Sequence, residues 1–169
     1  MPCSEAAASP ARPPMISQTT EYALRAIVFL GVGPGGAKTT AAISQGIRAP
    51  VAYLSKIMMG LARAQLVASQ RGLHGGFMLA REPSDMTIYD VVQAVDPILR
   101  ITSCPLDVSG HGKALCQLHA TLDLAMGQAE TLFRATRISD LLRGTEAGLG
   151  GLQDDCRFPK DFPAGGPHE

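Results

Sequence analysis

The chain has 169 residues, and its 15 lysines and arginines balance 15 aspartates and glutamates, so the formal net charge is zero. This length suits a single domain with a buried core, and the absence of tryptophan together with 5% aromatic residues favours helices over a β-sandwich. No apolar run approaches the roughly 18 residues that a membrane-spanning helix needs, so we expect no membrane segment.

The two ends of the chain differ in composition from its middle. Residues 1–14 are rich in Ala and Pro and lack the apolar core and the basic start of a signal peptide. Residues 144–169 contain clusters of Gly and Pro. We therefore expect a disordered extension or a start-site artefact over 1–14, a disordered tail over 144–169, and a cytoplasmic location.

The first predicted helix runs from Ser17 to about Gly31, because apolar residues recur there at helical spacing behind a Ser/Thr start. The following segment GVGPGGAKTT contains the pattern G-x-G-x-x-G and a Lys-Thr pair that resembles the end of a P-loop. Both nucleotide motifs require a preceding buried strand, and the P-loop needs glycine where Ala37 stands. Because a helix precedes the segment, we interpret it as a connection between helices.

Two short helices joined by a turn follow. The first is expected from Thr39 to Gly46, and the turn over residues 47–49. Pro50 then stands at the first turn of the second helix, where proline is favoured, and this helix reaches about Ala64. The spacing predicts a helix-turn-helix, although many helical hairpins share its outline.

The region around these helices is basic. Between Lys38 and Arg81 there are six lysines and arginines and no acidic residue, so this segment carries +6 and the remainder of the neutral chain −6. A surface of one sign attracts polyanions, with nucleic acid as the leading candidate. The alternative is a solvated face that happens to lack acidic residues.

A β-hairpin is predicted after the second helix. Two strand-like runs, 66–69 and 77–80, flank the segment QRGLHGG, whose glycines supply the permissive backbone of a hairpin tip. A hairpin in this position predicts a wing, with Arg71 and His74 at the tip, where a basic side chain can enter a narrow minor groove. The alternative for His74 is an ordinary exposed loop residue.

The residues expected to contact DNA on the helices form two groups. Those of the second helix that would read bases are Tyr53, Ser55 and Lys56. Those placed to contact phosphates, and so to position the protein without reading sequence, are Lys38, Arg48 and Arg63.

Three more helices are predicted in the second half of the chain. Thr87 and Asp90 resemble a capping box, and the helix that they open ends at Asp96–Pro97. A long helix then carries a heptad seam, which suggests pairing with a second subunit but could also pack on its own core. The seam residues are Leu115, Leu118, Leu122, Ala125, Ala129 and Leu132. Residues 138–142 can form a last short helix.

These elements define the expected architecture. The fold is mostly α with a small β-hairpin wing. A winged helix-turn-helix DNA-binding domain is expected over residues 15–97, and a sensor loop with a long dimerisation helix over 98–143.

The loop before the long helix contains candidate metal ligands. Cys104, Cys116 and His119 lie within sixteen residues, with His111 between the cysteines. Thiolate and imidazole suit zinc or an iron–sulfur cluster. Without an export signal, these cysteines favour a metal or redox role in a reducing compartment over a disulfide framework. The alternative is that both cysteines are buried apolar residues.

Several segments together resemble the Rrf-type winged-helix transcription regulators, the family that includes IscR and NsrR. They are the opening TTEYALRAIVFL, the run YLSKIMMGLARAQLV, the stretch RGLHGGFMLAREPSDMTIYDVVQAVDP and the cysteine loop, and the resemblance covers Met15 to about Arg143. It implies a homodimer that crosses its long helices and binds a palindromic operator in double-stranded DNA, usually as a repressor.

Cluster-binding members of this family have the loop pattern C-x5-C-x5-C, often with a histidine three residues further on. The corresponding positions here are Cys104, Gly110, Cys116 and His119, so the central cysteine is missing. The resemblance implies that further ligands would come from His111, His119 or Glu21 of the partner subunit. The centre would then be [2Fe–2S] or another iron–sulfur cluster, with zinc or no metal as alternatives. Glu21 is also an acid near a helix start, where the helix dipole favours it.

The leading functional interpretation is a DNA-binding regulator, not an enzyme. Its operator binding would be controlled by a metal centre or by redox-sensitive thiols in the Cys104–Cys116 loop, with iron status, nitric oxide or oxidants as the signal. The alternative is a cluster-free member controlled by a partner protein or a small metabolite. A third interpretation, an enzyme with a cysteine nucleophile and a histidine base, lacks any sequence feature for an oxyanion hole or a substrate cleft.

Overall fold

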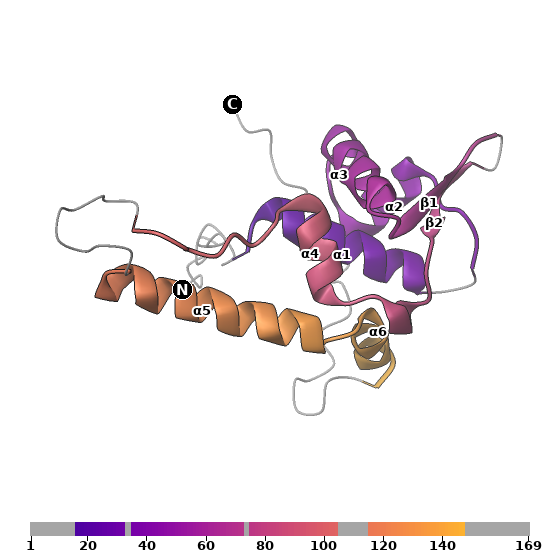
Figure 1. The fold of residues 1–169 in the computed structure, drawn as a ribbon. Coiled ribbons are helices and arrows are strands. Elements are labelled where there is room, and N and C mark those ends of the chain that lie inside the picture. Colours follow the sequence, from indigo (N-terminus) through magenta and orange to yellow (C-terminus); the bar gives the residue numbers. More distant parts are fainter. Residues whose placement is uncertain (1–15, 33–34, 73–74, 105–114, 148–169) are drawn as a thin grey trace, which may run out of the picture.

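The computed structural model describes residues 16–32, 35–72, 75–104 and 115–147. The expected disorder of residues 1–14, and of the tail beyond residue 147, lies outside these ranges. The helices and strands, in chain order, are α1 (Gln18–Gly31), α2 (Thr40–Ile47), α3 (Val51–Arg63), β1 (Val67–Gln70), β2 (Gly76–Leu79), the 3-10 helix η1 (Pro83–Asp85), α4 (Ile88–Val95), α5 (Gln117–Ala135) and α6 (Ile138–Ala147). Figure 1 shows α1 to α4 and the hairpin as one group, with α5 extending beside them and α6 at its C-terminal end.

Helix α1 lies at the centre of the core. It begins at Ser17, whose Oγ accepts a hydrogen bond from the Thr20 backbone N–H at 3.2 Å. Ala23, Ala26 and Ile27 have no exposed surface, and α1 packs against α2, α3, α4 and α6. Since two of these residues are alanines, the neighbouring helices can approach α1 closely.

Helix α3 is bounded by two residues in the left-handed region. Arg48, after α2, has φ 54°, and Gln65, after α3, has φ 57°. For a residue other than glycine this conformation costs about 1–2 kcal/mol. These residues reverse the chain on either side of α3, which buries Leu54, Met58 and Leu61 against the core.

The hairpin is attached to the helical core through a third short segment. Strands β1 and β2 pair antiparallel, with Ala68 opposite Met78. On the other edge of β2, Lys38 pairs with Phe77 through two backbone hydrogen bonds of 2.9 and 2.8 Å. The connection between α1 and α2 therefore holds β2 close to the turn of the hairpin.

The C-terminal elements join the core at one crossing point. Thr87 and Asp90 form the predicted capping box of α4, with hydrogen bonds in both directions. The backbone next to Thr87 pairs with that of Arg137, and Ile138 is fully buried. Helix α5 has no buried residue. It is therefore connected to the core mainly at its C-terminal end.

The mostly helical fold with a two-stranded hairpin is confirmed, and several predicted boundaries differ. The strands occupy Val67–Gln70 and Gly76–Leu79, each one residue away from the predicted runs 66–69 and 77–80. Leu115 precedes α5, which begins at Gln117, so the seam starts inside the helix only at Leu118. The last helix extends to Ala147, beyond both the predicted end at residue 142 and the predicted start of the tail at residue 144. A helix precedes the glycine-rich segment, in agreement with its interpretation as a connection.

Replacing Gly76 by Ala tests the attachment of the hairpin. A Cβ at this position would lie 2.3 Å from the Lys38 carbonyl oxygen, and backbone cannot move aside as a side chain can. We expect Gly76→Ala to lower the free energy of unfolding by about 2 kcal/mol, within the range of overpacked sites. Urea denaturation measures it, with Gly35→Ala as the control because nothing lies within 4 Å of its Cβ. Equal midpoints for the two variants would contradict the close approach.

Candidate nucleic-acid interface and thiol site

Helix α3 presents one face to the core and the opposite face to solvent. Its exposed residues are Val51, Ala52, Tyr53, Lys56, Met59 and Arg63. Ser55 is half-buried, and its hydroxyl donates to the Val51 carbonyl within the helix at 2.9 Å. Of the three residues predicted to read bases, Tyr53 and Lys56 are exposed and Ser55 is bonded within the helix.

Tyr53 is held in place by the start of α1. Its hydroxyl forms a hydrogen bond with that of Thr19, and its ring meets the Tyr22 ring edge to face, with centroids 6.0 Å apart. The Gln18 amide donates to the Tyr22 hydroxyl at 3.1 Å. The contact of Tyr53 with α1 was not predicted, because contacts between residues 34 positions apart leave no local sequence signal.

Lys38 has a role inside the chain. Its ammonium donates to the carbonyl oxygens of Phe29 at 2.7 Å and of Val32 at 2.9 Å, and lies 4.4 Å from the centre of the Phe29 ring. These carbonyls are at the C-terminal end of α1, where a cation is favoured. Lys38 therefore caps α1. These hydrogen bonds occupy N–H donors of the ammonium group that the sequence led us to expect on a DNA phosphate.

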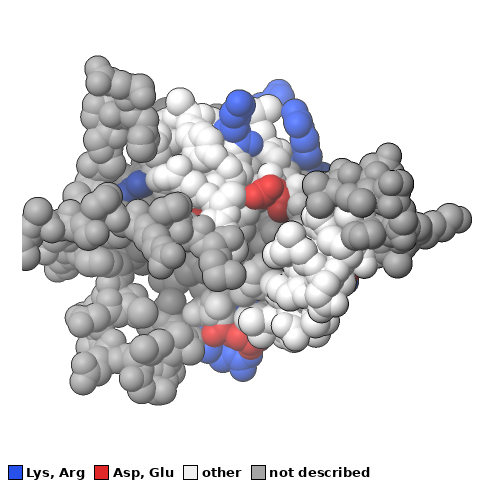
Figure 2. Space-filling view, turned by 90° about the vertical axis from the view of Figure 1, so that its left-hand side faces the viewer, with Lys and Arg blue, Asp and Glu red and all other residues white. Residues whose placement is uncertain are grey.

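The other predicted DNA contacts lie around α3 and along the hairpin. Arg48 is half-buried in the turn between α2 and α3, whereas Arg63 and Arg71 are exposed. Arg81 donates to the Ala64 carbonyl at 3.3 Å. His74 lies outside the described residues. Figure 2 shows a face of the molecule on which lysine and arginine side chains stand at separate places, one of them directly beside acidic side chains.

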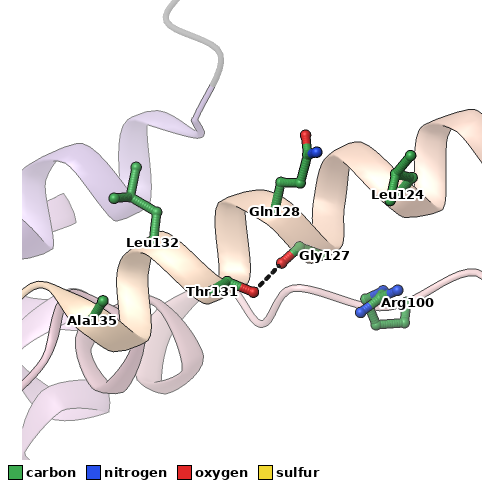
Figure 3. A pocket seen from close by; sticks show the side chains of 7 residues that line it. All are labelled: Arg100, Leu124, Gly127, Gln128, Thr131, Leu132 and Ala135. Carbon is green, nitrogen blue, oxygen red and sulfur yellow. Dashed lines mark hydrogen bonds between the residues drawn. The ribbon is translucent and has the colours of Figure 1, made fainter.

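The predicted seam lies on the exposed surface of α5. Large apolar side chains are exposed along this helix: Leu118 (61%), Leu122 (46%), Leu124 (62%) and Leu132 (63%). Ala125 is exposed as well, and Ala129 is half-buried. Figure 3 shows Leu124, Gln128 and Leu132 on one side of α5, along a groove that Arg100 also lines. Within the described residues, the leucines of the seam at 118, 122 and 132 are exposed, whereas Leu115 and Ala129 are half-buried.

Three of the predicted ligands converge at the start of α5. Cys116 is the N-cap residue of this helix, and His119 lies in its first turn. The His119 Nδ1 is 3.1 Å from the Cys116 Sγ and 3.5 Å from the Cys104 Sγ. The ligand atoms all lie within 4.8 Å of one another, and all three residues are half-buried. The spacing in the sequence therefore brings two thiols and an imidazole together.

The surroundings of Cys116 favour its thiolate. The backbone N–H of His119, and then its imidazole, lower the pKa of the Cys116 thiol from 9.0 to about 7. The start of a helix acts in the same direction. A thiol with this pKa is ready to bind a metal or to react near neutral pH.

The two remaining candidate ligands are not part of this group. Glu21 lies in the first turn of α1, where it forms an ion pair with Arg25 of the same helix. His111 lies outside the described residues. Within one described chain, the candidate donor set is two thiols and one imidazole.

Comparison with known proteins gives the context of these sites. Residues 16–144 match the profile of the Rrf2 family, described as iron-dependent transcriptional regulator. The HTH-type transcriptional regulator NsrR of Geobacillus kaustophilus is 29% identical over 148 residues, which cover 84% of this chain and 98% of that protein. The HTH-type transcriptional regulator IscR of Vibrio atlanticus is 39% identical over 113 residues, 66% of this chain and 57% of that protein.

Solved structures share the fold. The global cysteine regulator CymR of B. subtilis superposes with a TM-score of 0.63 at 23% identity, over 77% of this chain and 97% of that one. IscR of T. potens gives a TM-score of 0.62 at 24% identity, over 80% and 92% of the two chains. The described helices include none long and apolar enough to cross a membrane. Since the family profile covers the helix-turn-helix, the hairpin and α5, the chain belongs to the Rrf2 family of transcriptional regulators.

Proposed function

We propose that this regulator is a homodimeric repressor that binds a palindromic operator, and that a metal centre or redox-sensitive thiols in the Cys104–Cys116 loop control its affinity. The observation that carries the control is the convergence of two thiols and an imidazole at the start of α5. The site adjoins the helix with the exposed apolar seam, so a change at the site can alter how two subunits meet.

On the DNA side, α3 would enter the major groove and the hairpin the minor groove. The exposed Tyr53 and Lys56 support base contacts from α3, and Thr19 orients the Tyr53 ring. Arg48 and Arg63 would contact phosphates, and Arg71 and His74 would serve the wing. A dimer reads half-sites about one helical turn apart, roughly 34–36 Å, so the spacing between two α3 helices decides affinity.

The donor set fits a soft metal centre. Two thiolates and an imidazole suit zinc or an iron–sulfur cluster. Cys104, Cys116 and His119 would hold the group, and His111 or Glu21 of the partner subunit would complete the ligand set. Such a group, when bound, supplies ligand exchange and redox chemistry that iron status, nitric oxide or oxidants can change. The family description as iron-dependent supports this proposal.

The exposed surface of α5 supports the proposed dimerisation through this helix. Monomeric proteins rarely leave a row of leucines in water, and Leu118, Leu122 and Leu132 are all more than two-fifths exposed. A helix of this kind is normally covered by a second one. Crossing two copies of α5 would bury the row and bring two winged domains into one complex.

The alternative is a cluster-free regulator controlled by a partner protein or a metabolite. One observation favours it: Gly110 stands where cluster-binding relatives have the central cysteine. Two thiols and an imidazole of one chain then need an outside donor to hold a cluster. In this alternative the DNA-binding surfaces keep their roles.

Replacing Arg63 by Gln tests the phosphate contacts of the DNA interface. Each phosphate contact contributes about 0.9 to the slope of log affinity against log salt, so loss of one contact should reduce the slope by about that amount. Electrophoretic shifts of a duplex from the promoter of its own gene, over a salt series, measure this slope. Arg143→Gln is the control, because Arg143 is an exposed cation on α6. An unchanged slope in Arg63→Gln would remove Arg63 from the interface.

Replacing Cys104 by Ala tests the metal centre. Protein purified without oxygen should contain iron and sulfide, or zinc, and an iron–sulfur cluster should add visible absorption. Cys104→Ala should lose the metal because one of two thiolates is gone, whereas Cys156→Ala should retain it. Metal analysis and visible spectra provide the readout. A colourless wild-type protein free of iron and zinc would exclude the metal centre and favour the cluster-free alternative.

The reactivity of Cys116 should follow its lowered pKa. In metal-free protein, the alkylation rate of Cys116 should rise with pH through a midpoint near 7. The reason is that the reactive thiolate forms above the lowered pKa of about 7, whereas an ordinary thiol would form it only around 9.0. His119→Ala should move the midpoint part of the way up, since the backbone N–H of residue 119 remains. Peptide-resolved mass spectrometry measures the rates. A wild-type midpoint near 9 would contradict the interaction with His119.

A further inference from the structure

The segment between α4 and the thiol site is fastened to α5 at one point. The Arg100 Nε and Nη2 donate to the two oxygens of the Asp123 carboxylate at 2.7 and 2.6 Å. The backbone N–H of Ile101 donates to the same carboxylate at 2.9 Å. Asp123 therefore accepts three hydrogen bonds from two consecutive residues, Arg100 and Ile101. Both belong to residues 97–104, the segment that we call the strap.

The surface of α5 is shaped to receive Arg100. A Cβ on Gly127 would lie 2.9 and 3.1 Å from the two terminal nitrogens of the Arg100 guanidinium, so a side chain there would push the guanidinium away from this position. Exposed ion pairs usually contribute little, but paired parallel hydrogen bonds within a network are the stronger exception. The hydrogen bonds from Arg100 hold the pKa of the Asp123 carboxyl below its usual range, so the pair stays charged near neutral pH.

The same guanidinium begins a row of contacts that leads to the winged domain. Arg100 lies 3.7 Å from Glu130, and Glu130 accepts hydrogen bonds from Arg134 at 2.9 and 3.1 Å. The Arg134 Cζ stands 3.4 Å from the centre of the Tyr89 ring in α4. Helix α4 packs directly on α3, where Gly60 allows its backbone near the Ala94 carbonyl. Continuous contacts thus run from the strap to the proposed recognition helix.

The pairing of Arg100 with Asp123 limits how far the Cys104 thiol can move, because it shortens the free segment of chain that precedes Cys104. Measured from the end of α4 at Val95, Cys104 is nine residues away and could extend over about 30 Å, whereas four residues from Arg100 extend over about 13 Å. The volume that Cys104 can reach is a sphere with this length as its radius. A sphere of about 13 Å radius has roughly one tenth of the volume of a sphere of about 30 Å radius. Fastening Arg100 therefore concentrates the Cys104 thiol near Cys116 and His119.

We propose that Arg100 is a positioning residue whose pairing with Asp123 holds Cys104 in the thiol site, and that Glu130 and Arg134 connect this pair to Tyr89 of the winged domain. The proposal rests on the proposed function only for its second half, the connection to DNA binding. The first half concerns the geometry of two thiols and stands without metal or DNA.

A thiol-bridging experiment tests the first half. Full-length, metal-free protein with Cys3→Ser and Cys156→Ser leaves Cys104 and Cys116 as the two thiols, which dibromomaleimide can bridge. Arg100→Gln and Asp123→Ala should each slow the bridging several-fold, up to about tenfold from the ratio of reachable volumes. The double variant should be no slower than the slower single variant, because both changes remove the same contact. Mass spectrometry follows the bridging.

The same bridging rates provide the control and show which result would contradict the proposal. Arg143→Gln removes an Arg–Asp ion pair on α6 and should leave the rate unchanged. Thermal unfolding by circular dichroism shows whether each variant is folded at the assay temperature. Wild-type rates in folded Arg100→Gln and Asp123→Ala would overturn the positioning role.

The second half is tested by the ratio of promoter-DNA affinities between bridged and unbridged protein. Arg134→Gln should bridge at the wild-type rate, because Arg134 is not in the thiol site, but its affinity ratio should fall several-fold towards one. A wild-type ratio in Arg134→Gln would overturn the connection. If bridging leaves the DNA affinity of the wild-type protein unchanged, this result counts against the proposed control of DNA binding by the thiol site and against the connection through Arg134. The bridging rates would still decide the role of Arg100.

Discussion

The close packing of helices around α1 is the constraint on which the other features depend. Ala23 and Ala26 place only methyl groups between α1 and its neighbours, and the missing Cβ of Gly31 lets Leu142 of α6 reach the end of the helix. The same helix orients Tyr53 at its start through Thr19, and its end receives the Lys38 ammonium. Proposed base reading, attachment of the hairpin and docking of α6 therefore share one rigid element.

Helix α5 is stabilised in a different way from the core helices. It has 19 residues and buries none of them within the described chain. Asp123 pairs with Arg100 of the preceding segment, and Glu130 pairs with Arg134 within the helix itself. Hydrogen bonds of this kind bury little apolar area, so the leucines of α5 stay exposed. The described residues therefore form a packed group of core helices and a long helix with an exposed apolar row, the surface that the proposed dimer would cover.

The parts of the structure that local sequence determines could be predicted. The capping box of Thr87 and Asp90 and the turn before Pro50 are patterns within a few residues, and the spacing of Cys116 and His119 fits one helical turn. The contacts that sequence did not reveal join distant residues: Thr19 with Tyr53, and Arg100 with Asp123. The sequence shows the charge of Lys38, and from that charge we predicted a DNA phosphate contact. It does not show the two carbonyl oxygens that accept hydrogen bonds from Lys38, because their position depends on where α1 ends.

The two left-handed residues beside α3 restrict how this regulator can respond to a signal. Arg48 ends α2 three residues before α3 begins, and Gln65 lies two residues after α3 ends, so a shift of α3 along its axis would strain both short connections. Its buried face, with Leu54 and Met58, would also lose its fit to the core. Helix α3 is thus held in one position within its winged domain. The proposed control of DNA binding therefore acts on the distance and angle between two whole winged domains, and not on the position of α3 inside one of them.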